Sequence, residues 1–364
     1  MIVYFVSELI LYLSFALLTG TLILALVPSE KKPTIFVRKR WLQLALLSIV
    51  ITSAMPIVQV VVYLYDGIGL SLTIFNVLHN FEVGKAWGLI LGLSIFFYLI
   101  ISILPVQQNR IYSIISLLLL LAMILAVSLA SHAASLTEWT GLVYHMIHFL
   151  STSIWVGVLW VISWFSRDIK NWASFLTWFT PVAIICFSMT FFSGLFMMSL
   201  VVDLQDYTTS WLLNYGQALV IKHLLIIPLL VFAFFNGYLM KRRLKSNPSF
   251  NPKPWAKIES LLLLFIFTAT AVLGQNSPPH DIESTIRTSG VSPLFESFYG
   301  GGVLSLSDFQ MSLNVLSLIF VFLAIVFFIM LIISLQRKVP PIFSLITSLL
   351  CIFSAYAGLM VSFK

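Results

Sequence analysis

The sequence predicts an all-α polytopic integral membrane protein with about ten transmembrane helices and with the N-terminus and the C-terminus outside. Of its 364 residues, 60% are hydrophobic and only 9% are charged, whereas soluble domains carry about 25% charged residues. Its apolar runs are long enough to cross roughly 30 Å of hydrocarbon, which takes about 20 helical residues. The runs lack strand-like alternation, and a backbone in lipid must satisfy its own hydrogen bonds, so we expect helices.

Ten apolar runs have the required length. The first is too long for a signal-peptide core and precedes a basic loop, so we expect a retained helix rather than a cleaved signal. Most connections are short, which favours antiparallel packing of neighbouring helices in a bundle. The runs cover residues 3–27, 41–65, 85–104, 111–131, 139–164, 173–202, 212–240, 256–276, 312–335 and 342–361.

Basic residues predict the orientation of these helices. Five alternating loops hold 16 of the 20 Lys and Arg residues, an excess that is typical of cytoplasmic loops. Placing them inside leaves both termini outside. The formal charge of +7 is therefore a signal of topology, and we predict no nucleic-acid partner. The five loops are 28–40, 105–110, 165–172, 241–257 and 336–341.

Loop length suggests the domain organisation. We expect an eight-helix membrane core at 1–276, an extracytoplasmic loop at 277–311 and two additional C-terminal transmembrane helices at 312–364. The 277–311 loop is too long for a simple connector, which leaves a cap, a partner-docking segment or disorder. A second outer loop, 66–84, has room for a short surface helix. Both cysteines fall within spans, so no disulfide framework is indicated.

Three histidines on the predicted outer side form the main candidate site. His145 and His148 lie within a span and three residues apart, so they share a helix face. An imidazole in hydrocarbon is costly unless it binds something, which makes this pair a functional candidate. His132 ends the fourth span, while His145 lies on the order of 9 Å and His148 about 14 Å below the outer end of the fifth. An ion from outside would meet the three in turn.

Methionines at a similar depth indicate which ion fits. Met197 and Met198 lie near the outer end of the sixth span. Imidazole binds copper, zinc, iron and nickel, and thioether sulfur favours Cu(I), so this donor set favours copper over Mg²⁺ or Ca²⁺. Two plainer interpretations remain open: a methionine in a helix is more often packing, and a lone histidine can simply bond a neighbouring helix.

Lys222 and His223 form a second polar pair within a span. A lysine at this depth requires a partner, and Glu8, Asp203 and Asp206 are the candidates. The resulting ion pair either holds the first and seventh helices together or takes part in gating and coupling. An unpaired ammonium would repel a cation. We expect His223 to assist the transported ion.

Other motifs restrict the function. The sequence has no Walker-type loop, phosphorylatable Asp motif, Cys-x-x-Cys or Ser/His/Asp arrangement, so we expect neither an enzyme nor an ATP-driven pump. Asn236 and Glu259 lie toward the cytoplasmic side. We interpret Glu259 as a favourable charge at a helix N-terminus, with an ion release path as the weaker alternative.

Four fragments of the sequence carry a family resemblance: 84–87, 131–134, the run from His145 to Leu159, and 214–216 with Lys222. They resemble the copper resistance protein D family, membrane proteins associated with copper uptake. The resemblance covers roughly 70–280 and implies a functional role for residues that match His132, His148 and Lys222. His145 stands where the family pattern has an acidic or polar residue. The resemblance also implies an extracytoplasmic copper-binding partner, which for this chain is either a separate protein or unnecessary.

Together these observations predict copper ion transport across the plasma membrane of a bacterium, in the direction of uptake. An inside-negative potential contributes about 2.3 kcal/mol per unit charge for each 100 mV, so inward movement of a cation needs no ATP. Nearby sulfur favours Cu(I), while an all-imidazole site permits Cu(II). Two alternatives remain: a haem-binding electron-transfer or metal-reductase subunit, and a copper sensor or assembly factor that does not transport. The oligomeric state is not predicted.

Overall fold

A computed structural model describes residues 2–137, 139–247, 249–276, 281–299, 311–337 and 339–363. Within these ranges the chain is helical and forms no strand, apart from two isolated β-bridges. Ten helical segments of the described residues are long and apolar enough to cross a membrane, which confirms the predicted all-α polytopic class. The placement of both termini outside stays a prediction. The chain divides into two compact units, Met1–Leu200 and Val201–Lys364. The predicted division into a core at 1–276 and two C-terminal helices at 312–364 does not coincide with this boundary and stays a prediction.

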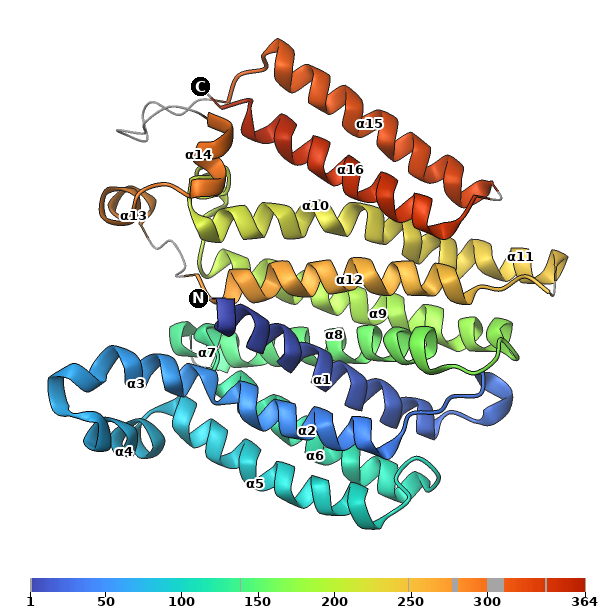
Figure 1. Cartoon of the computed structure of the whole chain (residues 1–364), viewed down its shortest axis with the longest axis horizontal. Coiled ribbons are helices and arrows are strands. Elements are labelled where there is room, and N and C mark those ends of the chain that lie inside the picture. The colour runs from blue at the N-terminus through green and yellow to red at the C-terminus, as the bar shows by residue number, and fades with distance from the viewer. Residues whose placement is uncertain are drawn as a thin grey trace. The chain divides into compact units, whose positions relative to one another are not determined.

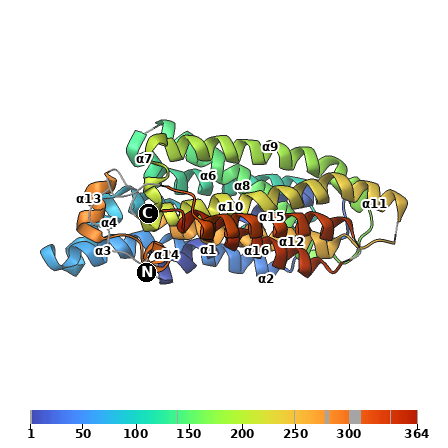
Figure 2. The same ribbon diagram turned by 90° about the horizontal axis from the view of Figure 1, so that it is seen from above.

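The first unit contains six of the spans, and its helices run alongside one another (Figures 1 and 2). The second span consists of two helices, and two short helices lie outside the spans. The helices are α1 Ile2–Leu26, α2 Lys39–Ser53, α3 Met55–Ile68, α4 Leu70–Asn80, α5 Glu82–Ile103, α6 Arg110–Leu129, α7 His132–Thr137, α8 Trp139–Phe165 and α9 Trp172–Ser199. Helix α4 confirms the short helix expected within 66–84.

Two glycines allow α1 and α8 to pack closely at the centre of this unit. A Cβ added to Gly20 would lie 2.1 Å from the carbonyl oxygen of Gly157, and one added to Gly157 would lie 2.2 Å from that of Ala16. Backbones approach this closely in membranes only where small residues face each other. Helix α8 is thereby held against α1 on one side and packs against α9 on another.

The second span is broken at Ala54, where the sequence predicted one continuous helix. Pro56 lacks an N–H group and disfavours helical geometry in the residue before it. The N–H of Ala54 bonds to the carbonyl of Ile51 at 3.3 Å, one residue short of the α-helical partner Val50. The indole Nε1 of Trp87 in α5 donates to the Val50 carbonyl at 3.0 Å. Trp87 therefore satisfies a carbonyl that the break exposes.

Loops that the charge pattern assigned to one side of the membrane do meet at one end of this unit. The N–H of Arg167 donates to the Thr34 carbonyl at 2.8 Å, and the N–H of Thr34 donates to Asp168 Oδ1 at 3.2 Å. Hydrogen bonding by the side chain of Thr34, together with the backbone N–H groups of Thr34 and Lys170, lowers the pKa of Asp168 below its usual value. Gln107 donates from its amide to the carbonyl of Val37 at 3.0 Å. The loops around 34, 107 and 167 therefore share one end, as predicted.

The second unit contains the other four spans. Its central helix passes through a π-helical turn, and the two C-terminal helices pack against each other and, through α16, against α10 and α12. Cys351 and, in the first unit, Cys186 are free and buried. The elements are the 3₁₀ turns η2 Leu204–Asp206 and η3 Thr209–Leu212, α10 Asn214–Phe234, the π turn η4 Phe235–Leu239, α11 Met240–Ser246, α12 Lys253–Gly274, α13 Ile282–Ser289, α14 Pro293–Tyr299, α15 Val315–Gln336 and α16 Pro341–Met360.

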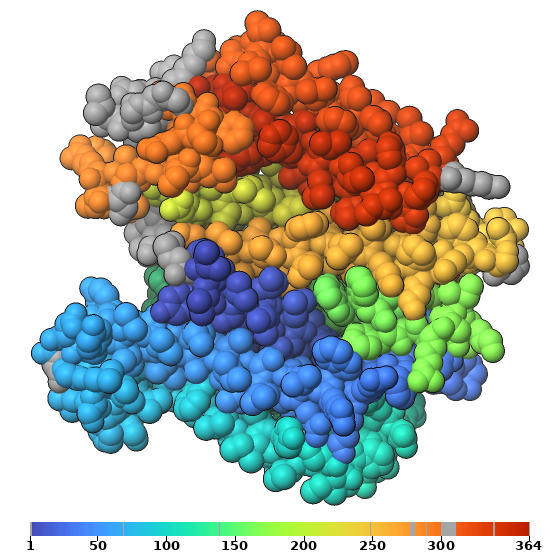
Figure 3. Space-filling view, viewed as in Figure 1, coloured from blue at the N-terminus to red at the C-terminus, as the bar shows by residue number. Residues whose placement is uncertain are grey.

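The described part of the 277–311 loop folds as a cap on one end of the second unit. Helix α14 inserts Phe295, which is fully buried, among Trp211, Tyr356 and Phe363. Helix α14 contacts both α10 and α16, and the orange atoms of the segment lie beside the yellow-green atoms of α10 in Figure 3. This arrangement favours the cap among the alternatives for the loop, while residues 277–280 and 300–310 lie outside the described ranges.

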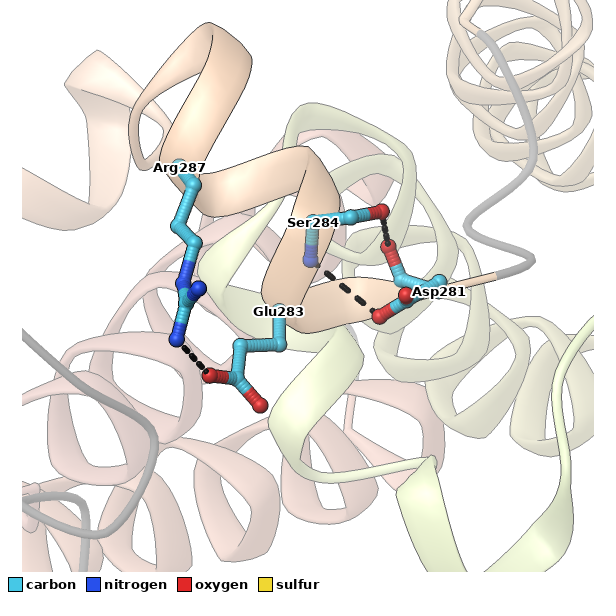
Figure 4. Close-up of polar contacts among 4 residues, drawn as sticks. All are labelled: Asp281, Glu283, Ser284 and Arg287. Atoms are coloured by element: carbon cyan, nitrogen blue, oxygen red, sulfur yellow. Dashed lines mark hydrogen bonds and ion pairs between the residues drawn. The ribbon is translucent and has the colours of Figure 1, made fainter.

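Helix α13 of the cap is stabilised by its own side chains (Figure 4). Asp281 caps its first turn by accepting a hydrogen bond from the N–H of Ser284 at 3.1 Å. Arg287 forms an ion pair with Glu283 one turn earlier, with an N–O distance of 2.5 Å. Exposed pairs of this kind contribute little stability, so the burial of Phe295 is the main attachment of the cap.

Candidate functional site

Polar and aromatic pairs line the face between α8 and α9. The Nδ1 atom of His148 lies 3.2 Å from Ser193 Oγ. The ring also packs on Gly194, where an added Cβ would lie 3.1 Å from the imidazole Cε1. Polar pairs between membrane helices fix how the helices are rotated against each other. Three further pairs continue the face: Tyr144 with Phe196, Thr152 with Thr190, and Trp155 with Phe187.

The hydroxyl of Ser193 favours one of the two neutral tautomers of His148. This hydroxyl donates to the carbonyl oxygen of Met189 at 2.5 Å, so toward His148 it acts as an acceptor. We infer that Nδ1 of His148 donates and that the lone pair lies on Nε2. Metal-binding histidines are commonly oriented in this way, with one nitrogen donating and the other ligating the metal.

His145 is also oriented by a hydrogen bond to a serine, but this serine belongs to a different helix. Its Nδ1 lies 3.0 Å from the hydroxyl of Ser128 in α6, and that hydroxyl donates to the carbonyl of Ile124 at 2.9 Å. The lone pair of His145 is therefore also placed on Nε2. The two histidines share α8 but bond to different neighbouring helices, a difference that the sequence did not predict.

The sequence predicted His132 at the end of the fourth span, but the structure places it beyond that span. Helix α6 ends at Leu129, and His132 begins the short helix α7, where its side chain is exposed. Gly141 makes this turn possible, because an added Cβ would lie 1.8 Å from the carbonyl oxygen of Ala133. His132 is thus a surface residue near Trp139, the first residue of α8.

The three histidines are not gathered into one three-histidine centre. In the part of the chain that the structure describes, no group of three or more His, Cys, Asp or Glu side chains has an arrangement that could hold a metal ion. Ligation by fewer histidines together with methionine sulfur stays a prediction. Met197 lies one helical turn beyond Ser193 and shares its face, while Met198 follows it on an adjacent face. Both methionines are half-buried.

Glu8 and Lys222 belong to different units, so the predicted ion pair between them stays a prediction. Within the first unit, the half-buried Glu8 accepts a hydrogen bond from the hydroxyl of Tyr12, one turn later in α1. Within the described residues of the second unit, Lys222 forms no ion pair with Asp203 or Asp206. Those two sequence-based candidates are therefore not its partners in this structure.

His223 is bound to the loop that precedes its helix. The hydroxyl of Tyr207 lies 2.6 Å from His223 Nδ1, and the two rings lie 5.8 Å apart. Burial raises the pKa of the Tyr207 hydroxyl, so the phenol stays neutral at physiological pH. Tyr207 also packs edge-on against Trp211. His223 is therefore oriented by a neutral phenol next to the cap.

One buried polar pair was not recognised from the sequence. Helix α12 begins at Lys253 rather than 256, so Glu259 lies well beyond the first turn and is not an N-terminal helix charge. Its side chain is buried and accepts a hydrogen bond from Asn236 Nδ2 at 2.7 Å. The prolines at 252 and 254 were an available signal, because proline favours the first turn of a helix.

The fold and these polar faces define a multi-pass α-helical membrane protein with oriented histidines on its spans. The family model described as copper resistance protein D matches residues 173–273, which confirms the predicted resemblance to that family. No curated protein matches the chain, and no solved structure does.

The matched stretch is narrower than the predicted one. It includes Lys222 and His223, together with Met197, Met198 and the pair of Asn236 and Glu259. The fragments at 84–87, 131–134 and 145–159 precede it. The histidine helix α8 therefore lies outside the match, although its partner α9 lies almost entirely inside.

Proposed function

We propose that the chain transports copper ions across the plasma membrane of a bacterium, in the direction of uptake. One observation carries the proposal. His148 precedes the stretch that matches the copper resistance family, yet its ring bonds to Ser193 and packs on Gly194, both inside that stretch. A histidine in hydrocarbon, oriented by a serine of the matched helix, is the strongest support for an ion path between α8 and α9.

Copper is the transported substrate in this proposal. His132 receives the ion at the membrane surface, and His145 and His148 offer the Nε2 lone pairs that their serine partners leave unprotonated. Met197 and Met198 supply soft sulfur, which favours Cu(I) over Cu(II). His223 assists, and Lys222 with Glu8 takes part in gating. A separate extracytoplasmic copper-binding protein or free copper supplies the ion, and the membrane potential drives it inward.

Copper accumulation in cells that express the chain tests the proposal. We expect His148→Ala to lower uptake several-fold and His148→Met to restore it when copper is supplied with a reductant, because a thioether ligates Cu(I). His79→Ala is the matched control. His79 is exposed on α4, and its ring centroid lies 4.3 Å from that of Phe75. Its Nδ1 bonds to the carbonyl of Phe75 in the same helix, so removal of the side chain should leave uptake unchanged.

Two outcomes would overturn the proposal. Equal uptake by the native chain, His148→Ala and cells without the chain would leave a sensor or assembly factor as the better interpretation. A haem absorption band in the purified protein that disappears in His148→Ala would instead indicate the electron-transfer alternative. Expression of each variant in the membrane, measured by immunoblot, separates loss of transport from loss of protein.

A further inference from the structure

The pair of Asn236 and Glu259 lies inside the second unit, at the end that carries its basic residues. Glu259 is 4% exposed and Asn236 is 7% exposed. Asn236 Nδ2 donates to Glu259 Oε2 at 2.7 Å and to the carbonyl of Trp255 at 3.2 Å. Asn236 belongs to the π turn η4, and such turns are frequent at functional sites. A carboxyl group is thus buried in a spanning segment next to an irregular turn.

The charged groups of the surrounding elements do not neutralise Glu259. Its own helix carries Lys253 and Lys257, and α10, which packs on it, carries Lys222 and His223. The charged residues of the following segments are Lys241, Arg242, Arg243 and Lys245 in α11 and Arg337 after α15. None of them forms an ion pair with Glu259 among the described residues of this unit. The guanidinium of Arg243 lies instead over two aromatic rings, Phe235 at 5.6 Å and Phe250 at 4.8 Å.

The remaining neighbour, α16, contributes no charge. Its titratable side chains are Cys351 and Tyr356, and both bond elsewhere. The Cys351 thiol donates to the carbonyl of Ala324 at 3.4 Å, and the Tyr356 hydroxyl donates to Gln217. An ionised carboxyl group at Glu259 would therefore be buried with an amide as its principal donor, an arrangement that disfavours the charged form.

The donors at this site fit a proton better than a metal ion. Carboxylate and amide oxygens do not suit a soft ion such as Cu(I), and hard cations require about six oxygen ligands. Asn236 Oδ1 is buried and has no hydrogen-bond donor. A protonated carboxyl supplies one O–H donor in addition to an acceptor oxygen, whereas the ionised form supplies none.

We propose that Glu259, held by Asn236, binds and releases a proton in the transport cycle, so that copper movement is coupled to a proton gradient. The inference rests on the proposed function. In the binding step, a hydronium ion at the basic end of the unit gives up a proton and becomes water, and an O–H bond forms on one carboxyl oxygen. The other oxygen remains the acceptor for Asn236 Nδ2. Helix α10 and its π turn connect Asn236 to His223, on the order of 20 Å away along the helix.

Proteoliposomes that contain the purified full chain test this inference. Copper influx is measured at a fixed copper gradient while the pH on the basic side is varied. A single titrating carboxyl changes its ratio of protonated to ionised forms tenfold per pH unit, so we expect the influx of the native chain to change by up to about tenfold per unit. Glu259→Gln should give an influx that does not vary with pH. Glu30→Gln, at an exposed carboxyl of the turn Ser29–Lys31, should respond like the native chain.

Infrared difference spectra of the same samples give a second readout, which does not require transport. We expect a titrating carboxyl band that Glu259→Gln removes and Glu30→Gln retains, and that Asn236→Leu shifts to a different midpoint. A native influx without pH dependence, or a Glu259→Gln influx as pH-dependent as the native one, overturns the proton site but leaves copper transport standing. Absence of any influx overturns the proposed function, and the infrared band then decides the proton site alone.

Discussion

The Nδ1 atom of His148 in α8 lies 3.2 Å from the hydroxyl oxygen of Ser193 in α9. This bond orients the imidazole, assigns its lone pair to Nε2 and links the histidine helix to the stretch that matches the copper resistance family. The proposed copper site depends on this contact more than on any other. A substitution at Ser193 removes the residue that orients the ring but keeps the histidine that would bind copper.

Ser193→Ala should weaken copper binding while leaving both histidines in place. Loss of a residue that orients a ligating histidine typically costs about 10- to 100-fold in metal affinity. Competition with a Cu(I) chelator on the purified protein measures the change. Ser199→Ala, an exposed serine on the same helix, is the matched control. Equal affinities for both variants would show that the orientation of His148 is irrelevant to copper.

Gly20→Ala should destabilise the protein, whereas Gly92→Ala should not. At Gly20 the new Cβ would lie 2.1 Å from the carbonyl oxygen of Gly157, so α1 and α8 must separate, at a cost of about 1–3 kcal/mol. At Gly92 the Cβ meets nothing within 4 Å, and alanine is the better helix former by about 1 kcal/mol. Thermal unfolding in detergent compares them, and equal midpoints would refute the close crossing.

Trp87→Phe should loosen the break in the second span. The indole donor to the Val50 carbonyl is lost while the aromatic ring remains, so we expect a cost of about 1 kcal/mol. Trp41→Phe, at an exposed tryptophan of α2, removes an indole outside the break and should be neutral. Faster amide hydrogen exchange around residue 54 in the first variant alone is the expected signature, and identical exchange in both would contradict it.

Phe295→Ala should detach the cap from the second unit. The side chain is fully buried, and truncation of such a phenylalanine costs about 3–5 kcal/mol. Limited proteolysis between residues 281 and 299 should become faster. The neighbouring Leu294 is exposed, so Leu294→Ala should leave the cleavage rate unchanged. If the two variants are cleaved at the same rate, the burial of Phe295 does not attach the cap.

The spans were predictable because they depend only on local composition. A helix in lipid must satisfy its own backbone, so an apolar run of sufficient length determines its structure without knowledge of its neighbours. The same holds for the loops around 34, 107 and 167, whose charges predicted a shared end. The break at Ala54 carried a local signal as well, in Pro56, but it required treating a proline within an apolar run as a boundary.

The partners of the histidines were not predictable, because they depend on how each helix is rotated and on which helices are neighbours. Nothing local distinguishes Ser128 and Ser193, which bond to the histidines, from other serines in the spans. The π turn at 235–239 likewise has no evident sequence signal, so the orientation of Asn236 toward Glu259 was not predictable. Tertiary packing, rather than propensity, decides such contacts.

Copper flux into proteoliposomes that contain only this chain is the most direct test of the central claim. With an inside-negative potential of about 100 mV, a monovalent cation should accumulate on the order of 50-fold inside. We predict potential-dependent Cu(I) accumulation with the native chain, a several-fold lower rate with His148→Ala and the native rate with His79→Ala. Folded native protein that admits no more copper than protein-free liposomes would contradict the account.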